Sequence, residues 1–274
     1  MYYSNVWKSL HGSVCNITLS SKEGIKIYSL SGFKYKNYII SEDTVFSFPH
    51  VKRINITFFG PDGNEKKETL QMSIKEFESR LITKANGYYE KFLIIRLWGG
   101  ELENIPSLQF GCSKRLEIGT KVAIIGYQKD FNNLSLKTGI ISSFYLEGAT
   151  HRYIEFESSI KRGIPGSPLI DPLSYEVVGI VGCSMSSVAK KFSRLKTIIN
   201  DNIQTLEKAK GKINICEIDP VQVFIANQNI VKNLAREMHN SAYAHNALAI
   251  PSREVTRFFK KYHHNSQFSS RNGR

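Results

Sequence analysis

This chain of 274 residues lacks the sequence patterns that mark a zinc site or a membrane-spanning helix. It has only four cysteines, and no two of them form the Cys-x-x-Cys pair that is typical of zinc sites. The four are Cys15, Cys112, Cys183 and Cys216. A run of about 18 apolar residues, which a membrane-spanning helix needs, is absent from the sequence. We therefore expect no metal, no cofactor and no membrane span.

A recognisable targeting segment is absent as well. The N-terminal residues, MYYSNVWKSLHG, lack both the apolar core of a secretion signal and an arginine-rich amphipathic pattern. The cysteines are accordingly interpreted as buried thiols in a reducing compartment, with two disulfides as the alternative. This interpretation predicts an intracellular protein and leaves the compartment open, the mitochondrion being one candidate.

Acidic residues are in the minority. The chain has 37 lysines and arginines against 24 aspartates and glutamates, which gives a formal net charge of +13. Such an excess favours an anionic partner, namely nucleic acid, a membrane surface or an acidic protein. A lysine-rich proteome would produce the same excess without any such partner. Hydrophobic residues make up 41% and charged residues 22%, as in folded globular proteins.

The pattern that is abundant is that of short β-strands. β-Branched and aromatic residues cluster or alternate at 13–20, 25–30 and 54–59, which predicts strands there. The sequence Gly-Pro-Asp-Gly at 60–63 predicts a turn after the third of them. The exception is 73–81, where apolar residues recur at helical spacing and predict a short helix.

The most informative stretch is 163–168, GIPGSP. It resembles the Gly-x-Ser-Gly-Gly/Ser-Pro nucleophile turn of trypsin-like serine peptidases, with Pro165 at the position of the catalytic serine. Proline has no hydroxyl to attack a carbonyl and no N–H to contribute to an oxyanion hole. The resemblance therefore implies a turn that has lost its nucleophile. Ser167, the only hydroxyl in the turn, is expected to stabilise it.

Two upstream segments resemble the strands that carry the family's other catalytic residues. The segment 38–46, YIISEDTVF, resembles I-x-T-x-x-H-V-V, with Thr44 in place of the general-base histidine. The segment 91–97, KFLIIRL, resembles D-[LI]-A-[LV]-L-K-[LI], with Lys91 in place of the orienting aspartate. Threonine is no base near neutral pH, and Glu90 beside Lys91 points to the opposite face of a strand. The resemblance thus implies that all three catalytic positions are degenerate.

The second half resembles the family most closely. The segments 105–127 and 138–142 resemble the interdomain segment and the strands that follow it, and 175–182 resembles the strand that leaves the nucleophile turn. The pattern stops at Cys183 and resumes at 246–251, NALAIP, which resembles the G-F-A-I-P strand of the Deg/HtrA branch. The resemblance implies an all-β fold, a trypsin-like double β-barrel with a helical insertion and a C-terminal helix.

This fold divides the chain into four parts. We expect an N-terminal β-barrel at 10–100, a C-terminal β-barrel at 101–185 plus 243–252, a helical insertion at 186–242, and a C-terminal helix with a basic tail at 253–274. Ser252 is predicted to cap the last helix. The apolar residues spaced to pack this helix back are Val255, Phe258, Phe259 and Tyr262. The residues from 263 onward are expected to form a free tail.

The insertion has helical periodicity. Asp219 and Pro220 predict the start of its second helix, and Gly211 a break between the two. The apolar stripes are Val188, Phe192, Leu195, Ile199 and Leu206 in the first helix, and Phe224, Val231, Leu234 and Met238 in the second. Two interpretations stay open, a hairpin packed on its own barrel and a docking element for a partner. The candidate binding residues are Lys190, Lys191, Arg194 and Lys196.

Three functional hypotheses follow. The first is a non-catalytic trypsin-like domain, a pseudoprotease, that serves as a structural or binding subunit of a larger assembly of proteins. The second, which overlaps it, places the subunit in a nucleic-acid-containing assembly in which the positive charge meets RNA phosphates. The third is an active serine-type hydrolase with displaced groups, in which His50, Ser167 and Asp43 would do the chemistry.

Overall fold

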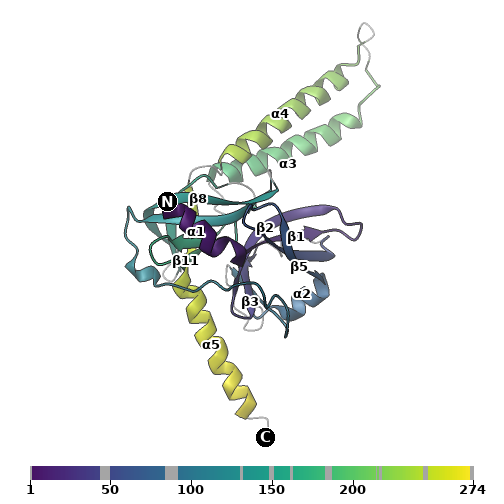
Figure 1. The fold of residues 1–274 in the computed structure, drawn as a ribbon. Helices are drawn as coiled ribbons and strands as arrows, with labels where there is room; N and C mark the ends of the chain where they lie inside the picture. The colour runs from purple at the N-terminus through teal and green to yellow at the C-terminus, as the bar shows by residue number, and fades with distance from the viewer. Residues whose placement is uncertain are drawn as a thin grey trace. The chain divides into compact units, whose positions relative to one another are not determined.

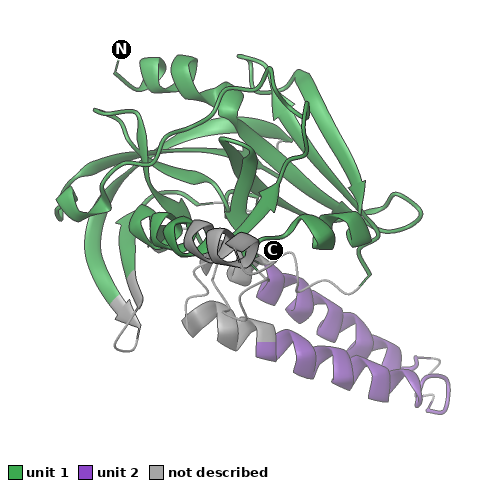
Figure 2. Ribbon diagram, turned by 90° about the horizontal axis from the view of Figure 1, so that it is seen from below, with its two compact units in different colours: residues 1–183, 246–274 green, residues 184–245 purple. Residues whose placement is uncertain are grey.

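The computed structural model describes residues 2–43, 50–83, 92–129, 132–147, 151–160, 163–182, 187–213, 215, 218–242 and 246–271. The chain forms two compact units, which Figure 2 shows in two colours. Unit 1 comprises residues 1–183 and 246–274, and unit 2 comprises residues 184–245. The expected fold class is confirmed, because unit 1 is built mostly of strands in two sheets and carries a helical insertion and a C-terminal helix.

The N-terminal half of unit 1 (Figure 1) is a six-stranded antiparallel sheet with the order β5-β4-β1-β2-β3-β6. Its strands are β1 (Val14–Ser20), β2 (Lys26–Tyr35), β3 (Tyr38–Glu42), β4 (Arg53–Phe59), β5 (Lys66–Ser73) and β6 (Phe92–Arg96). The predicted short helix is α2 (Ile74–Arg80), and the Ser73 side chain caps it by accepting from Glu76 N–H at 3.2 Å. After α2 the chain returns to β6, where Ile82 N–H donates to the Ile94 carbonyl at 3.0 Å. The segment after α2 is thereby joined to the β6 edge of the sheet.

The C-terminal half is a closed barrel with the order β10-β11-β12-β9-β8-β7. Its strands are β7 (Lys121–Gln128), β8 (Asn133–Glu147), β9 (His151–Glu157), β10 (Pro168–Asp171), β11 (Glu176–Val181) and β12 (Asn246–Pro251). A short 3-10 helix, η4 (Ser113–Arg115), precedes β7. Because β11 and β12 are neighbours in the barrel, the insertion leaves and re-enters at adjacent strands.

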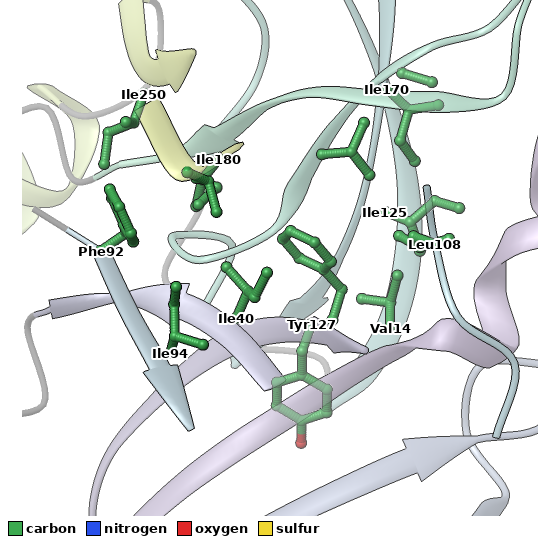
Figure 3. Close-up of a cluster of buried hydrophobic side chains, with 14 of the residues drawn as sticks. Val14, Ile40, Phe92, Ile94, Leu108, Ile125, Tyr127, Ile170, Ile180 and Ile250 are labelled. Carbon is green, nitrogen blue, oxygen red and sulfur yellow. The ribbon is translucent and has the colours of Figure 1, made fainter. Parts of the chain in front are cut away.

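Three apolar cores account for the packing of unit 1. Each half has its own core, and a third lies between the halves (Figure 3). Strand alternation divides the residues among them: in β3, Ile39 faces the N-terminal core whereas Ile40 faces the shared one. Because both faces of β3 and β6 are covered, these strands have nearly continuous apolar sequences.

A buried lysine fixes the segment that links the two halves. Lys34 on β2 donates from Nζ to the carbonyls of Leu102 at 2.8 Å and Ile105 at 2.7 Å. Its own carbonyl accepts from Leu108 N–H at 2.9 Å. Burial lowers the pKa of Lys34. The Lys34 side chain thus holds the linking segment by binding two of its carbonyl groups.

The two terminal helices also pack on unit 1. No sequence pattern above predicts α1 (Tyr2–Leu10), which buries Val6 and donates from Trp7 Nε1 to the Pro61 carbonyl at 2.8 Å. Helix α5 (Ser252–Arg271) begins where predicted and buries Val255, Phe258 and Phe259. Tyr262 packs beside them and accepts a hydrogen bond from Arg96.

Two details of α5 differ from the predictions. The Ser252 hydroxyl does not cap its own helix; it donates to the Gly111 carbonyl at 2.8 Å and ties α5 to the segment before β7. The residues from 263 onward were expected to form a free tail, but the backbone stays helical as far as Arg271. Polar composition alone does not end a helix when no proline or glycine interrupts it.

Unit 2 is a hairpin of two helices, α3 (Ser187–Glu207) and α4 (Pro220–Ala242), as the periodicity predicts. Gly211, at φ +74°, donates from its N–H to Asp219 Oδ2 at 2.8 Å. Asp219 also caps α4 by accepting from Val221 N–H at 2.9 Å, and these hydrogen bonds lower the pKa of its carboxyl group. Ile215 and Ile218 exchange two backbone hydrogen bonds in the connection.

The two helices touch along a seam that differs from the predicted stripe. On α4 the least exposed residues are Val221, Ile225, Gln228, Lys232 and Ala235, spaced alternately four and three residues apart. This spacing defines one face of a helix, and α3 and α4 are in contact. The predicted stripe residues Phe224, Val231 and Leu234 are exposed instead. The side chains of Val188, Phe192 and Met238 lie outside the described residues.

The cysteine prediction is partly wrong. Cys15 and Cys112 are both free thiols, but only Cys15 is buried, and its burial raises the pKa of the thiol. Cys112 is exposed in the segment before η4. Cys183 and Cys216 lie outside the described residues. None of the described helices is long and apolar enough to cross a membrane.

Candidate functional site

The turn at 163–167 enters β10 and has a backbone that only glycine allows at two positions. Gly163 has φ +94° and Gly166 has φ +89°. A Cβ atom at Gly163 would lie 2.4 Å from the Tyr127 carbonyl oxygen, and one at Gly166 would lie 2.0 Å from the Ser31 carbonyl oxygen. Both glycines are therefore required by conformation and by space.

Three backbone hydrogen bonds hold the turn against two neighbouring strands, β2 and β11. Ser31 N–H donates to the Pro165 carbonyl at 2.8 Å, which joins β2 of the N-terminal half to the turn. Gly166 N–H donates to the Val181 carbonyl at 2.7 Å, and Val181 N–H donates to the Ser167 carbonyl at 2.8 Å. The turn is thereby fixed to both halves of unit 1.

Ser31 is the side chain that connects the turn to its surroundings. Its buried hydroxyl donates to the Gly163 carbonyl at 2.6 Å and accepts from Tyr127 N–H at 2.8 Å. The equally buried Ser41 donates to the Ser31 carbonyl at 2.5 Å. Sequence analysis did not identify this role. The only available signal was the presence of small hydroxyl residues inside two apolar strands.

Ser167 is placed where it stabilises the turn, as expected. The residue is fully buried, its hydroxyl donates to the Ile164 carbonyl at 2.5 Å, and its N–H donates to the same oxygen at 3.0 Å. A hydroxyl has one proton to donate, and here that proton is directed back into the turn. A serine in this position is accessible neither to a substrate nor to a general base.

The structure describes one of the three positions that the resemblance aligns with the family's catalytic residues. Pro165 is buried within the turn, and its ring supplies neither a hydroxyl nor an N–H. Thr44 and Lys91 lie outside the described residues. Among the displaced candidates, His50 is exposed and Asp43 is half-buried, with interactions of its own.

A lysine cluster that the sequence did not reveal lies around Tyr127. Lys26 Nζ lies 5.2 Å from the centre of the Tyr127 ring, which also stacks on Phe59. Burial and the nearby Lys129 and Lys66 lower the pKa of Lys26, and burial raises the pKa of Tyr127. Mutual repulsion of this kind makes an anion favourable beside the cluster.

The predicted binding residues all belong to α3. Arg194 and Lys196 are exposed, so both are accessible to a partner. Lys190 and Lys191 belong to the helical backbone, but their side chains lie outside the described residues. Among the described residues, no group of three or more histidine, cysteine, aspartate or glutamate side chains is placed to hold a metal ion.

Two antiparallel six-stranded halves with a glycine-dependent turn between them define the two-barrel class of peptidase domains. A model of the trypsin-like peptidase domain matches residues 39–180, more than half of the chain. The chain therefore belongs to the trypsin-like peptidase domain family. No curated protein sequence matches it.

Solved structures agree with this fold. The HtrA-type protease AlgW with a tripeptide is 15% identical at a TM-score of 0.50, and the match covers 66% of this chain and 54% of AlgW. Deg5 is 16% identical at a TM-score of 0.50, with coverage of 67% of this chain and 85% of Deg5. The chain thus corresponds to about half of AlgW. At these identities the likeness shows the fold alone.

Proposed function

We propose that this protein is a non-catalytic trypsin-like domain, a pseudoprotease, that serves as a structural or binding subunit of a larger assembly. The observation that supports the proposal most directly is Pro165 at the nucleophile position of a turn that otherwise retains the family's glycines. Removing the serine removes the attacking oxygen and one oxyanion-hole N–H together. Thr44 and Lys91 at the other two positions point the same way.

The alternative is a hydrolase with displaced groups, and the geometry of Ser167 weighs against it. Nucleophilic catalysis requires a hydroxyl that reaches both a base and a substrate carbonyl. The Ser167 hydroxyl is fully buried and donates to the Ile164 carbonyl at 2.5 Å. Using it would require breaking the turn that joins the two halves.

Probe labelling tests this proposal on the purified full chain. We expect no labelling by a fluorophosphonate and no hydrolysis of casein, with trypsin as the positive control. Pro165→Ser should also stay inactive, because the new serine has neither a histidine at position 44 nor an aspartate at position 91 to activate it. Stoichiometric labelling that disappears in Ser167→Ala would contradict the proposal and support the displaced site.

A second candidate function, RNA binding within the same assembly, is favoured by the lysine cluster around Tyr127. The groups in question are Lys26, Lys66 and Lys129, whose repulsion an RNA phosphate would relieve. Fluorescence anisotropy with a single-stranded RNA should then give an affinity that falls steeply with salt. Replacing Lys66 and Lys129 by glutamine should lower the slope of log K against log salt by about 1.4. Lys52→Gln and Lys121→Gln are the matched surface controls. If the slope of the Lys66→Gln/Lys129→Gln variant is unchanged, RNA does not bind at this cluster.

A further inference from the structure

We infer that unit 2 is a dimerisation element, in which the apolar face of α4 packs against the same face of a second copy of this chain. The face consists of five exposed residues spaced along one side of α4. They are Val223, Phe224, Ile230, Val231 and Leu234, with exposed fractions between 44% and 65%. This inference concerns the binding role proposed above but does not depend on the loss of catalysis.

The hairpin is amphipathic around its own seam. The side of α4 opposite the apolar face carries Gln222, Asn229, Asn233 and Arg236, all exposed. That side is suited to water, whereas the apolar face leaves on the order of several hundred Å² of hydrocarbon uncovered, and an apolar patch of this size often marks an interaction site. Helix α3 adds Leu195 and Ile198, which are also exposed.

The exposed apolar residues of unit 1 offer no matching surface within the described part of the chain. They are distributed over α1, several turns and β8: Tyr2, Ile25, Trp98, Ile118, Ile140, Tyr145, Leu173 and Tyr175. These residues do not form a continuous stripe as long as the apolar face of α4. A second copy supplies a face of the same length and composition by symmetry.

The lengths of the two helices and the absence of charge on the apolar face favour a second copy of the chain as the partner. Helices of 21 and 23 residues are about 32 and 35 Å long, and two such hairpins make a four-helix bundle of ordinary size. With its polar rim, the apolar face approaches the roughly 800 Å² per partner of a specific interface. The α4 positions 223, 224, 227, 230, 231 and 234 hold no charged residue. Two positively charged chains can therefore approach there without like-charge contacts.

Charge also selects the orientation of the two hairpins. The charged residues near the open end of the hairpin are mostly basic, with Arg194, Lys196 and Arg236 against Glu237, whereas the connecting end carries Glu207 and Asp219 among its lysines. Antiparallel stacking places the open end of one hairpin beside the connecting end of the other. Parallel stacking would instead bring the basic ends together.

Sedimentation velocity of the full chain tests the inference. We expect a dimer with a dissociation constant of roughly micromolar order, and a monomer for the double variant Phe224→Glu/Ile230→Glu. The matched control Gln222→Glu/Asn229→Glu makes the same charge change on the polar side of the same helix and should remain a dimer. Circular dichroism checks that both variants keep their helix content.

Each other outcome contradicts the inference that the apolar face of α4 forms a dimer interface. A wild-type monomer at about 100 µM would overturn it, as would a dimer that survives Phe224→Glu/Ile230→Glu. Dissociation of both variants would show that net charge, and not the apolar face, controls assembly. Should the glutamate pair unfold the hairpin, Phe224→Ser/Ile230→Ser provides the same comparison without new charge. If the dimer is not found, the proposed absence of catalysis still stands, because fluorophosphonate labelling tests it separately.

Discussion

The turn at Pro165 and the helical hairpin of unit 2 differ in how their surroundings constrain them. Hydrogen bonds from Ser31, Val181 and Gly166 fix the turn, and two glycine positions leave no room for a Cβ atom. The hairpin is held by one seam and by the hydrogen bonds of Asp219, and much of its apolar surface is exposed. One region is constrained by the fold, and the other leaves apolar surface exposed.

This difference bears on the proposed loss of the serine from the turn. The contacts at Pro165 use the carbonyl of that residue, which any amino acid provides, and the neighbouring glycines satisfy the two strained positions. The turn joins the two halves of unit 1, so its packing contributes to stability whatever residue occupies the nucleophile position. The contacts of the turn are therefore compatible with the proposed replacement of the serine by Pro165.

The largest effect is expected where the turn is tightest. Gly166→Ala places a methyl group against the Ser31 carbonyl and should lower the free energy of unfolding by about 4 kcal/mol or more, measured by urea denaturation. Gly24→Ala is the matched control, because Gly24 also has positive φ, +83°, but no atom lies within 4 Å of the place that its methyl group would occupy. Gly24→Ala should lower the free energy of unfolding by about 1–2 kcal/mol, because only backbone strain is added. Equal losses at both sites would mean that the turn adapts and is not rigid.

A smaller effect is expected at the ion cluster beside α2. The buried Arg80 donates to Glu101 Oε2 at 2.5 Å and Oε1 at 2.9 Å, and its guanidinium lies 3.7 Å from the centre of the Trp98 ring. The hydrogen bond from Arg80 lowers the pKa of Glu101. Glu101→Gln should cost about 1–3 kcal/mol at neutral pH, because it leaves a buried charge with one carboxylate partner fewer.

The pH dependence of that loss has a definite sign. Since the folded pKa of Glu101 is below the unfolded value of about 4.3, its stabilisation is present above that value and is lost as the pH falls through the folded pKa. The wild-type advantage over Glu101→Gln should therefore shrink between about pH 5 and pH 3. Glu117→Gln, at an exposed position, serves as the control. A constant difference over this range would exclude Glu101 as the titrating group.

The smallest effect on unit 1 is expected from removing the hairpin. Replacing residues 186–242 by a short Gly/Ser linker should change the free energy of unfolding by about 1 kcal/mol or less, because β11 and β12 are already neighbours and loop length has a weak effect. A single cooperative melt together with a monomeric sedimentation profile is the expected result. Unfolding of the deletion variant would show that the helices belong to the core of unit 1.

The fold was largely predictable, and the omissions have a physical cause. In the second half, β7, β8 and β11 were recognised because the segments 105–127, 138–142 and 175–182 resemble strands of the family. Helix α1 and strand β5 were missed. Helix α1 has apolar residues at helical spacing, Tyr3, Val6, Trp7 and Leu10, which sequence analysis did not use. Strand β5 buries only Met72, so its own sequence carries no clear alternation. Edge elements of this kind are defined by their neighbours and not by their own composition.

The candidate site was predictable only where it is local in sequence. Pro165 was identified within a six-residue pattern, whereas its contact with Ser31 joins positions more than a hundred residues apart. The α4 stripe illustrates a second limit. Periodicity correctly identified Phe224, Val231 and Leu234 as one apolar face, but it reports amphipathicity and not which surface covers that face.

The entry of unit 2 between two neighbouring strands also has a mechanical consequence. Gly182 N–H donates to the Leu248 carbonyl at 2.8 Å, directly where the chain leaves β11 and returns to β12. A force applied to the connection between α3 and α4 would reach the barrel at one end of the β11–β12 ladder and load its hydrogen bonds one after another. A ladder loaded in this way unzips at lower force than one sheared along its length. Tension on an assembly held through the hairpin would therefore separate β11 from β12 before other strands of the barrel.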